Sequence, residues 1–166
     1  LVWLPIGINA RGDWKQTLEE ELGQAIYEKS RVAALDGNRL TARGTAFVVK
    51  QPGILASPAR HTGAVNTKVN AGRIEQPGGI AALFSERNTT EFRVGEIVYL
   101  TEVEVRESAV VLEFLTEALQ PIVERGSTAH MRYKGQVQFL FPSGFLEAAS
   151  ASALAQVFDA CFEPQP

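Results

Sequence analysis

The chain has 166 residues, which is enough for one domain with a single hydrophobic core. Its 45% apolar and 21% charged residues are typical of a globular protein and exclude a disordered tail, a collagen and a coiled coil. Sixteen Lys and Arg residues against nineteen Asp and Glu residues give a net charge of −3, so no nucleic-acid partner is expected.

The cysteine count and the hydropathy exclude two further classes. A single cysteine, Cys161, rules out an intramolecular disulfide framework and a zinc site of the CxxC type. No run in the sequence reaches the roughly 18 consecutive apolar residues that a membrane helix needs. We therefore predict no transmembrane segment.

Residues 1–10 are mostly apolar and end at Ala10, a small residue that the polar chain follows directly. This pattern is typical of the end of a secretory signal, and an N-terminal arm packed on a domain would show it too. We expect a signal-peptide remnant or such an arm here, followed by one globular domain over residues 11–166. The favoured localisation is periplasmic or secreted, with the cytoplasm as the alternative.

The stretch 14–35 has apolar residues at spacings of three and four, which predicts an amphipathic helix. Asp13 precedes it as a helix cap, and Gln16 stands at the third helical position. We therefore interpret Arg11-Gly12-Asp13 as a helix start and not as an integrin-binding loop. Gly37 is expected to end the helix in the left-handed conformation.

Short strands are predicted to follow the helix. Thr45–Lys50 is a β-branched and aromatic run, and Ile54–Ala56 continues it as a second strand. Residues 65–69 alternate apolar and polar side chains up to a three-residue turn at Asn70-Ala71-Gly72. Residues 73–75 can return from this turn, so we expect a short hairpin.

The clearest pattern is the alternation over residues 92–105, which predicts one long strand with a bulge at Gly95. Arg106-Glu107-Ser108 turns the chain, and residues 110–114 alternate on the way back with Glu113 facing outward. These segments predict an antiparallel hairpin.

A loop that holds Pro121 and Gly126 is expected next, followed by a half-buried strand over residues 133–141. Ser150 or Ser152 can cap a final helix with one apolar stripe. The tail that follows this helix, residues 163–166, is expected to be solvated.

This order of elements predicts an α+β fold. We expect a small, strongly bent antiparallel sheet or a partly open β-barrel of the SH3-like or OB-like kind. The N-terminal and C-terminal helices would pack on its open side and bury the apolar stripes.

Three stretches, from Phe92 to Val105, from Val110 to Leu115 and from Arg132 to Gly144, resemble a family of uncharacterised exported proteins of acidobacterial type. That family shows an N-terminal helix, a hairpin, an "RY-G-F-FP-G" strand and a final helix, over about residues 14–162 of this chain. The shared motifs are structural glycines and alternating apolar residues. The resemblance therefore implies a fold and an exported location, and it implies no activity or catalytic residue.

Few residues have the sequence context that catalysis or metal binding needs. His61 and His130 lie 69 residues apart, and neither has a second ligand at a metal-binding spacing. Cys161 lies on an apolar helical stripe, where a thiol behaves as an inert hydrophobe. Ser143 lacks a GxSxG context, and Gly78-Gly79 lacks the lysine of a phosphate-binding loop. No catalytic residue, metal or cofactor is predicted.

The acids of the central hairpin are the best candidates for catalysis. Glu102 and Glu104 project to one side of a strand, and Glu113 can lie beside them on the next strand. Paired carboxylates of this kind would suit a glycosidase-like hydrolase. A solvated sheet face shows the same alternation, and we favour that interpretation because no pattern indicates that one acid is desolvated.

A locally basic stretch is the best candidate for ligand binding. Arg60, His61, Lys68 and Arg73 are opposed in sequence only by Glu75, and they suit an anion or an acidic partner. Long loops between rigid strands are where binding residues concentrate.

The leading hypothesis is therefore a non-enzymatic binding or structural module of the bacterial cell envelope or exterior. It would contact a protein, peptide or envelope ligand through the loop-rich segment 57–91 or an exposed sheet edge. The hydrolase that uses the hairpin acids is the alternative, and an envelope protein that acts through assembly alone is a third. The oligomeric state stays open.

Overall fold

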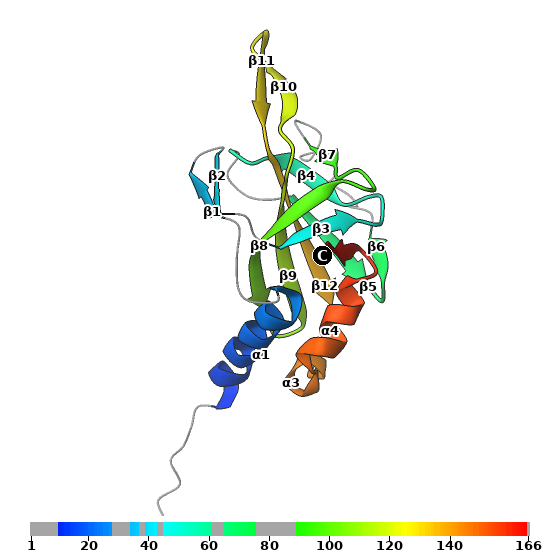
Figure 1. The fold of residues 1–166 in the computed structure, drawn as a ribbon. Helices are drawn as coiled ribbons and strands as arrows, with labels where there is room; N and C mark the ends of the chain where they lie inside the picture. The colour runs from blue at the N-terminus through cyan, green and yellow to red at the C-terminus, as the bar shows by residue number, and fades with distance from the viewer. Residues whose placement is uncertain are drawn as a thin grey trace, which may run out of the picture.

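The computed structural model describes residues 10–27, 34–36, 39–42, 45–60, 65–75 and 89–165. One strongly curled sheet forms a half-barrel, with helices at one end and a long hairpin at the other (Figure 1). The predicted mixed α+β class is confirmed. Residues 1–9 lie outside the described residues.

Seven strands form the main path of the sheet, in the order β13-β3-β8-β9-β12-β4-β7, and β5 and β6 branch from β12. The strands of the main path are β3 (Ala46–Val49), β4 (Leu55–Pro58), β7 (Thr90–Glu91), β8 (Ile97–Val105), β9 (Ala109–Thr116), β12 (Tyr133–Leu140) and β13 (Phe162–Pro164). The remaining strands are β1 (Ala34–Asp36), β2 (Arg39–Ala42), β5 (Val65–Asn70), β6 (Arg73–Glu75), β10 (Gln120–Glu124) and β11 (Ser127–Met131).

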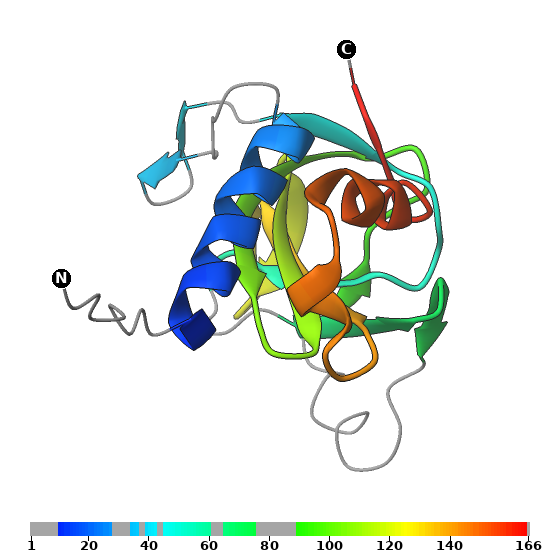
Figure 2. The same ribbon diagram turned by 90° about the horizontal axis from the view of Figure 1, so that it is seen from below.

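The helices lie at the lower end of the sheet. Figure 2 shows α1 (Ala10–Tyr27) and α4 (Ala151–Phe158) across this end, with the one-turn helix α3 (Phe145–Ala148) preceding α4. Leu22 of α1 and Leu154 of α4 belong to the same buried cluster as the strand side chains. Among the described residues, no helix is both long enough and apolar enough to cross a membrane.

Of the two predicted caps of the last helix, Ser150 and Ser152, the structure uses Ser150. Ser150 is the N-cap of α4, and its hydroxyl accepts a hydrogen bond from Ala153 N at 3.3 Å.

The predicted start of the long strand is wrong by several residues. Gly95 has φ +86° and lies in a turn, so residues 92–96 separate β7 from β8 instead of forming a bulge within one strand. The β8–β9 hairpin is confirmed, with Val105 opposite Val110.

A bulge between Leu100 and Glu102 divides β8 into two halves. Val98 and Leu100 are buried before it, and Val103 and Val105 face the same core after it. The unbroken alternation predicted from Ile97 to Val105 is therefore wrong, because the extra residue at the bulge exchanges the inward and outward positions.

The prediction of an antiparallel sheet is wrong for one pair of strands. β4 runs antiparallel to the start of β12, and the chain then returns as β5, parallel to β12 from Gly135 to Leu140. The β5–β6 hairpin itself is confirmed, but Asn70 pairs with Arg73, so its turn has two residues instead of three.

The first helix differs from its prediction at both ends. It begins at Ala10, so Arg11-Gly12-Asp13 has helical backbone and Asp13 is not the cap. Leu35 lies in β1, which pairs with β2 so that Asp36 stands opposite Arg39. A sequence that stops a helix can equally turn a hairpin. Gly37, the expected helix stop, lies outside the described residues.

The side chains of the C-terminal tail are solvated over residues 163–165, as predicted, but its backbone is paired with the sheet. β13 pairs with β3, and Gln165 N donates to Ala46 O at 2.8 Å. Phe162 is buried and stacks on Phe114 with ring centroids 3.9 Å apart, which explains why the tail is held. The side chain of Glu163 is exposed, as expected.

β4 crosses very close to β12 at Gly135. A Cβ atom built on Gly135 would lie 2.2 Å from the Leu55 carbonyl oxygen and 3.0 Å from Phe92 Cε2. Leu55 N donates to Thr67 Oγ1 at 2.8 Å, and Thr67 is buried. Only glycine allows β4 to pass at this distance while its backbone stays hydrogen-bonded.

We predict that Gly135→Ala destabilises the protein by about 3 kcal/mol, because the added methyl group meets backbone instead of a movable side chain. Chemical denaturation measures the change. Lys134→Ala on the neighbouring position is the control and should cost less than about 0.5 kcal/mol. Equal stability of the two variants would contradict the crossing.

Candidate functional site

The predicted basic residues are only partly brought together. Lys68 and Arg73 are exposed on the β5–β6 hairpin, where Lys68 stands opposite Glu75 and Arg73 opposite Asn70. Asn70 Nδ2 also donates to Glu75 Oε1 at 3.2 Å. The positive charge of Lys68 therefore has an acid beside it. His61 lies outside the described residues.

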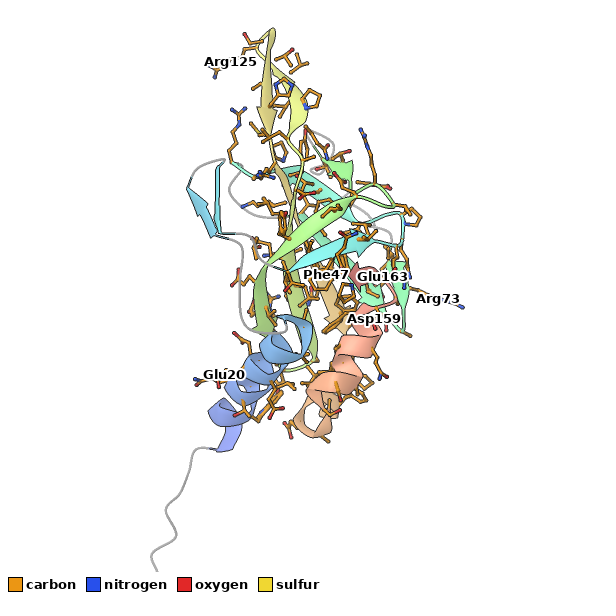
Figure 3. The ribbon with its side chains drawn as sticks, in the orientation of Figure 1. Glu20, Phe47, Arg73, Arg125, Asp159 and Glu163 are labelled. Carbon is orange, nitrogen blue, oxygen red and sulfur yellow. The ribbon has the colours of Figure 1, made fainter. Side chains whose placement is uncertain are left out.

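Arg60 lies at the other end of β12. Ala59 N donates to Arg132 O at 2.9 Å, just before β12 begins, whereas Lys68 pairs with Gln138 near its end. These points are six residue steps apart along the chain, which is about 20 Å in a strand. Arg60 thus does not share one binding site with Lys68. Figure 3 shows Arg73 on the β5–β6 hairpin, far from Arg125 at the tip of the β10–β11 hairpin.

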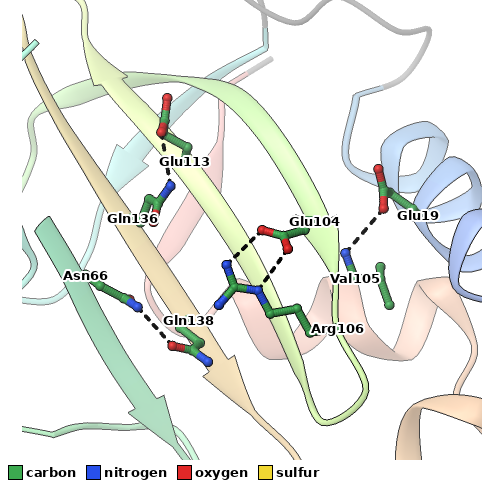
Figure 4. Close-up of polar contacts among 8 residues, drawn as sticks. All are labelled: Glu19, Asn66, Glu104, Val105, Arg106, Glu113, Gln136 and Gln138. Atoms are coloured by element: carbon green, nitrogen blue, oxygen red, sulfur yellow. Dashed lines mark hydrogen bonds and ion pairs between the residues drawn. The ribbon is translucent and has the colours of Figure 1, made fainter. Parts of the chain in front are cut away.

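The hairpin acids alternate with core residues and therefore lie on the side of the sheet that faces away from the core, and Figure 4 shows the contacts of Glu104 and Glu113. Glu104 forms a two-point ion pair with Arg106, with both N–O distances 2.9 Å, and this pair lowers the pKa of Glu104. Glu113 accepts a hydrogen bond from Gln136 Nε2 at 3.2 Å, and Glu102 is exposed. A general acid needs a raised pKa, so the shift of Glu104 is in the wrong direction.

The other residues considered for chemistry have structural surroundings. Cys161 is buried, and this burial raises the pKa of its thiol to about 11. Ser143 is exposed in the turn before α3, and His130 is exposed on β11. Within the described part of the chain, no group of three or more His, Cys, Asp and Glu side chains is placed to hold a metal ion.

The most distinctive surface feature is the hairpin of β10 and β11, which we call the arm. It extends the β9–β12 hairpin well beyond the rest of the sheet (Figure 1). Its strands pair antiparallel from Gln120 opposite Met131 to Glu124 opposite Ser127. The predicted loop around Pro121 and Gly126 is therefore wrong.

The turn of the arm explains why a proline is accepted in one of its strands. Arg125 and Gly126 have φ +50° and +80°, as in a type I′ turn. In such a hairpin Glu124 and Ser127 bond to each other, and every second residue points its N–H outward. Pro121 occupies one of these outward positions, so it breaks no bond within the arm.

The base of the arm is held by buried polar contacts. Thr116 is fully buried, and its hydroxyl accepts from Tyr133 N and donates to Ala118 O, both at 2.9 Å. Arg132 Nη1 donates to the carbonyl oxygens of Thr116 and Glu117. These contacts bind the extra residues between β9 and β10 to the start of β12.

Contacts to β8 fix the same junction from the side. Tyr99 donates its hydroxyl to Glu117 Oε1 at 2.7 Å, and Gln120 Nε2 donates to Glu96 Oε1 at 2.6 Å. Ile122 and Met131 are buried, at 6% and 5% exposure. The arm is therefore anchored at its base and is not a loosely tethered loop.

Beyond its base the arm is open to solvent. Pro121, Val123, Thr128 and His130 share one face, because Pro121 stands opposite His130 and Val123 opposite Thr128. All are exposed, and Val123 reaches 70%. The sequence signal for the arm is a two-residue turn ending in glycine between short β-branched segments.

Comparison with known proteins finds no match: no family model, no curated protein and no solved structure is similar to this chain. The resemblance to exported proteins of acidobacterial type stays a prediction. The function proposed below therefore depends on the geometry of the arm alone.

We predict that Thr116→Val loosens the arm, because Tyr133 N–H and Ala118 C=O both lose their buried partner. The loss of stability should be about 2 kcal/mol. Hydrogen exchange of the 120–131 amides should accelerate more than that of β9. Thr128→Val, at an exposed position, is the control; if it changed arm exchange as much as Thr116→Val, the anchoring account would fail.

Proposed function

We propose that this chain is a non-enzymatic binding module of the bacterial cell envelope or exterior. It contacts a protein or peptide partner through the arm and the adjoining start of the loop-rich segment 57–91. The observation that carries the proposal is the arm itself, an exposed hairpin with an anchored base.

The energetics of the arm support a binding role. A two-stranded hairpin alone is marginally stable in water. Here buried contacts of Thr116 and Arg132 order the base, and they hold the exposed strand edges of the arm away from the sheet. A pre-ordered strand loses less entropy when a partner binds it.

The filled interior of the half-barrel supports the same proposal. Phe114 packs edge-on against Phe47 with centroids 5.8 Å apart and stacks on Phe162. Phe139 packs against Phe158 at 4.6 Å. Side chains thus fill the space in which a ligand-carrying barrel would hold a small molecule, which favours the outer surface for binding.

The basic residues have two places in this proposal. Arg60 follows β4 beside the base of the arm, where it would contact an acidic group of the partner. Lys68 and Arg73 form a separate surface on β5–β6 that would suit an envelope ligand. A half-barrel of the SH3-like or OB-like type, covered by the two helices, fits this role because such folds bind through strands and connecting loops.

Site-specific photo-crosslinking in the native host tests this function. A photo-reactive residue at position 123 of the arm should give a discrete adduct. The same residue at exposed Ser143, beside α3 at the opposite end, should not. Identical adduct patterns at the two positions would contradict the proposal.

A shortened-arm variant provides an independent comparison. Gln120 and Met131 stand opposite each other, so Asn-Gly can replace residues 121–130 and close the hairpin nearer to the sheet. We expect this variant to keep the far-ultraviolet circular dichroism of the sheet. A photo-reactive residue at the adjoining position 60 should capture the partner in the full-length arm protein and no longer in this variant. Retained capture would show that the arm is not required.

A further inference from the structure

The two edges of the arm differ in their capacity to add a strand. On β10, Pro121 stands at an outward position and has no N–H to donate. On β11, Thr128 is at an outward position and keeps both its N–H and its C=O. Of the two outward positions on β10, only Val123 therefore keeps an N–H, whereas neither outward position of β11, Thr128 or His130, is a proline.

We propose that the occupant of this edge is a second copy of the same chain, bound by antiparallel pairing of β11 with β11. This inference rests on the proposed function, since it names the partner of the arm. The two-fold axis passes between the two copies of Thr128, and each Thr128 donates its N–H to the carbonyl oxygen of the other.

The residues around Thr128 suit pairing with themselves. A two-fold interface needs a surface that is complementary to itself. In this register Ser127 stands opposite Ala129 of the other copy, so small, uncharged side chains meet on both sides of the axis. No like charges face each other there, and directly opposed threonines are a favourable cross-strand pair.

The blocked edge decides what kind of assembly can form. Pairing through β11 produces a four-stranded sheet whose outer edges are both β10. Pro121 removes a donor from this edge and discourages a further strand, so the assembly closes at two copies and does not grow into a fibre. The interface is small, so we expect a reversible dimer with a dissociation constant of about 1–100 μM.

Matched proline substitutions test the edge assignment. Thr128→Pro removes the outward N–H of β11, and Val123→Pro removes the outward N–H of the opposite position on β10. Sedimentation equilibrium should show a concentration-dependent dimer for the wild type and for Val123→Pro. Thr128→Pro should weaken the dimer at least about tenfold. Circular dichroism and thermal unfolding verify that both variants fold.

Disulfide trapping tests the register without a proline. Directly opposed Cα atoms in a bonded pair lie about 5.5 Å apart, which a disulfide can span. Thr128→Cys should therefore form a covalent dimer under mild oxidation. Ser127→Cys should not, because the two copies of residue 127 do not stand opposite each other. The native Cys161 is buried and does not compete.

A wild-type chain that stays monomeric up to about 500 μM would overturn the self-pairing, as would equal trapping of the two cysteine variants. If the crosslinker at position 123 then captures a different protein, the proposed function stands and only the identity of its partner is wrong. If position 123 captures nothing that position 143 does not, the proposed function fails as well.

Discussion

The arm depends on the hydrogen bonds that join it to the sheet where its neighbouring strands stop. β8 begins at Ile97 and β4 ends at Pro58, so the hairpin continues upward with no strand beside it among the described residues. Three residues separate β9 from β10 on one strand of the hairpin, and only Arg132 separates β11 from β12 on the other. Thr116 and Arg132 satisfy the backbone groups that this mismatch would leave unpaired in the interior.

The half-barrel below supplies the rigid support for this junction. β12 pairs with β9 on one side and with β4 and β5 on the other, and Gly135 lets β4 pass close enough to keep the barrel curled. The Phe114 and Phe162 stack ties the last strand into the same core. The interior is therefore used for stability, which is why the proposed partner contact is assigned to the arm on the outer surface.

Local patterns in the sequence were sufficient for the elements that the core defines. Alternation predicts the β8–β9 hairpin, β12 and the outward position of Glu113, and the apolar stripe of α4 is equally clear. Pro121 favours a loop in the sequence, so the pattern does not predict the arm, although a strand position whose N–H points outward accepts proline. The helix was extended over Leu35 because Asp36-Gly37 is typical of a helix end as well as of a hairpin turn.

Other features leave no local pattern at all. The parallel pairing of β5 with β12 joins segments about seventy residues apart, and nothing within either strand specifies it. The same long-range pairing separates Arg60 from Lys68, which are near neighbours in sequence. A site inferred from a basic stretch is therefore divided once the strands are placed.

We infer from these contacts that the arm is a rigid extension of the sheet and not a mobile loop. Backbone ¹⁵N relaxation of the full chain measures this directly. We expect order parameters of about 0.85 for Ile122 and Ala129, close to those of β9. Values below about 0.6 for the arm beside rigid β9 residues would contradict it.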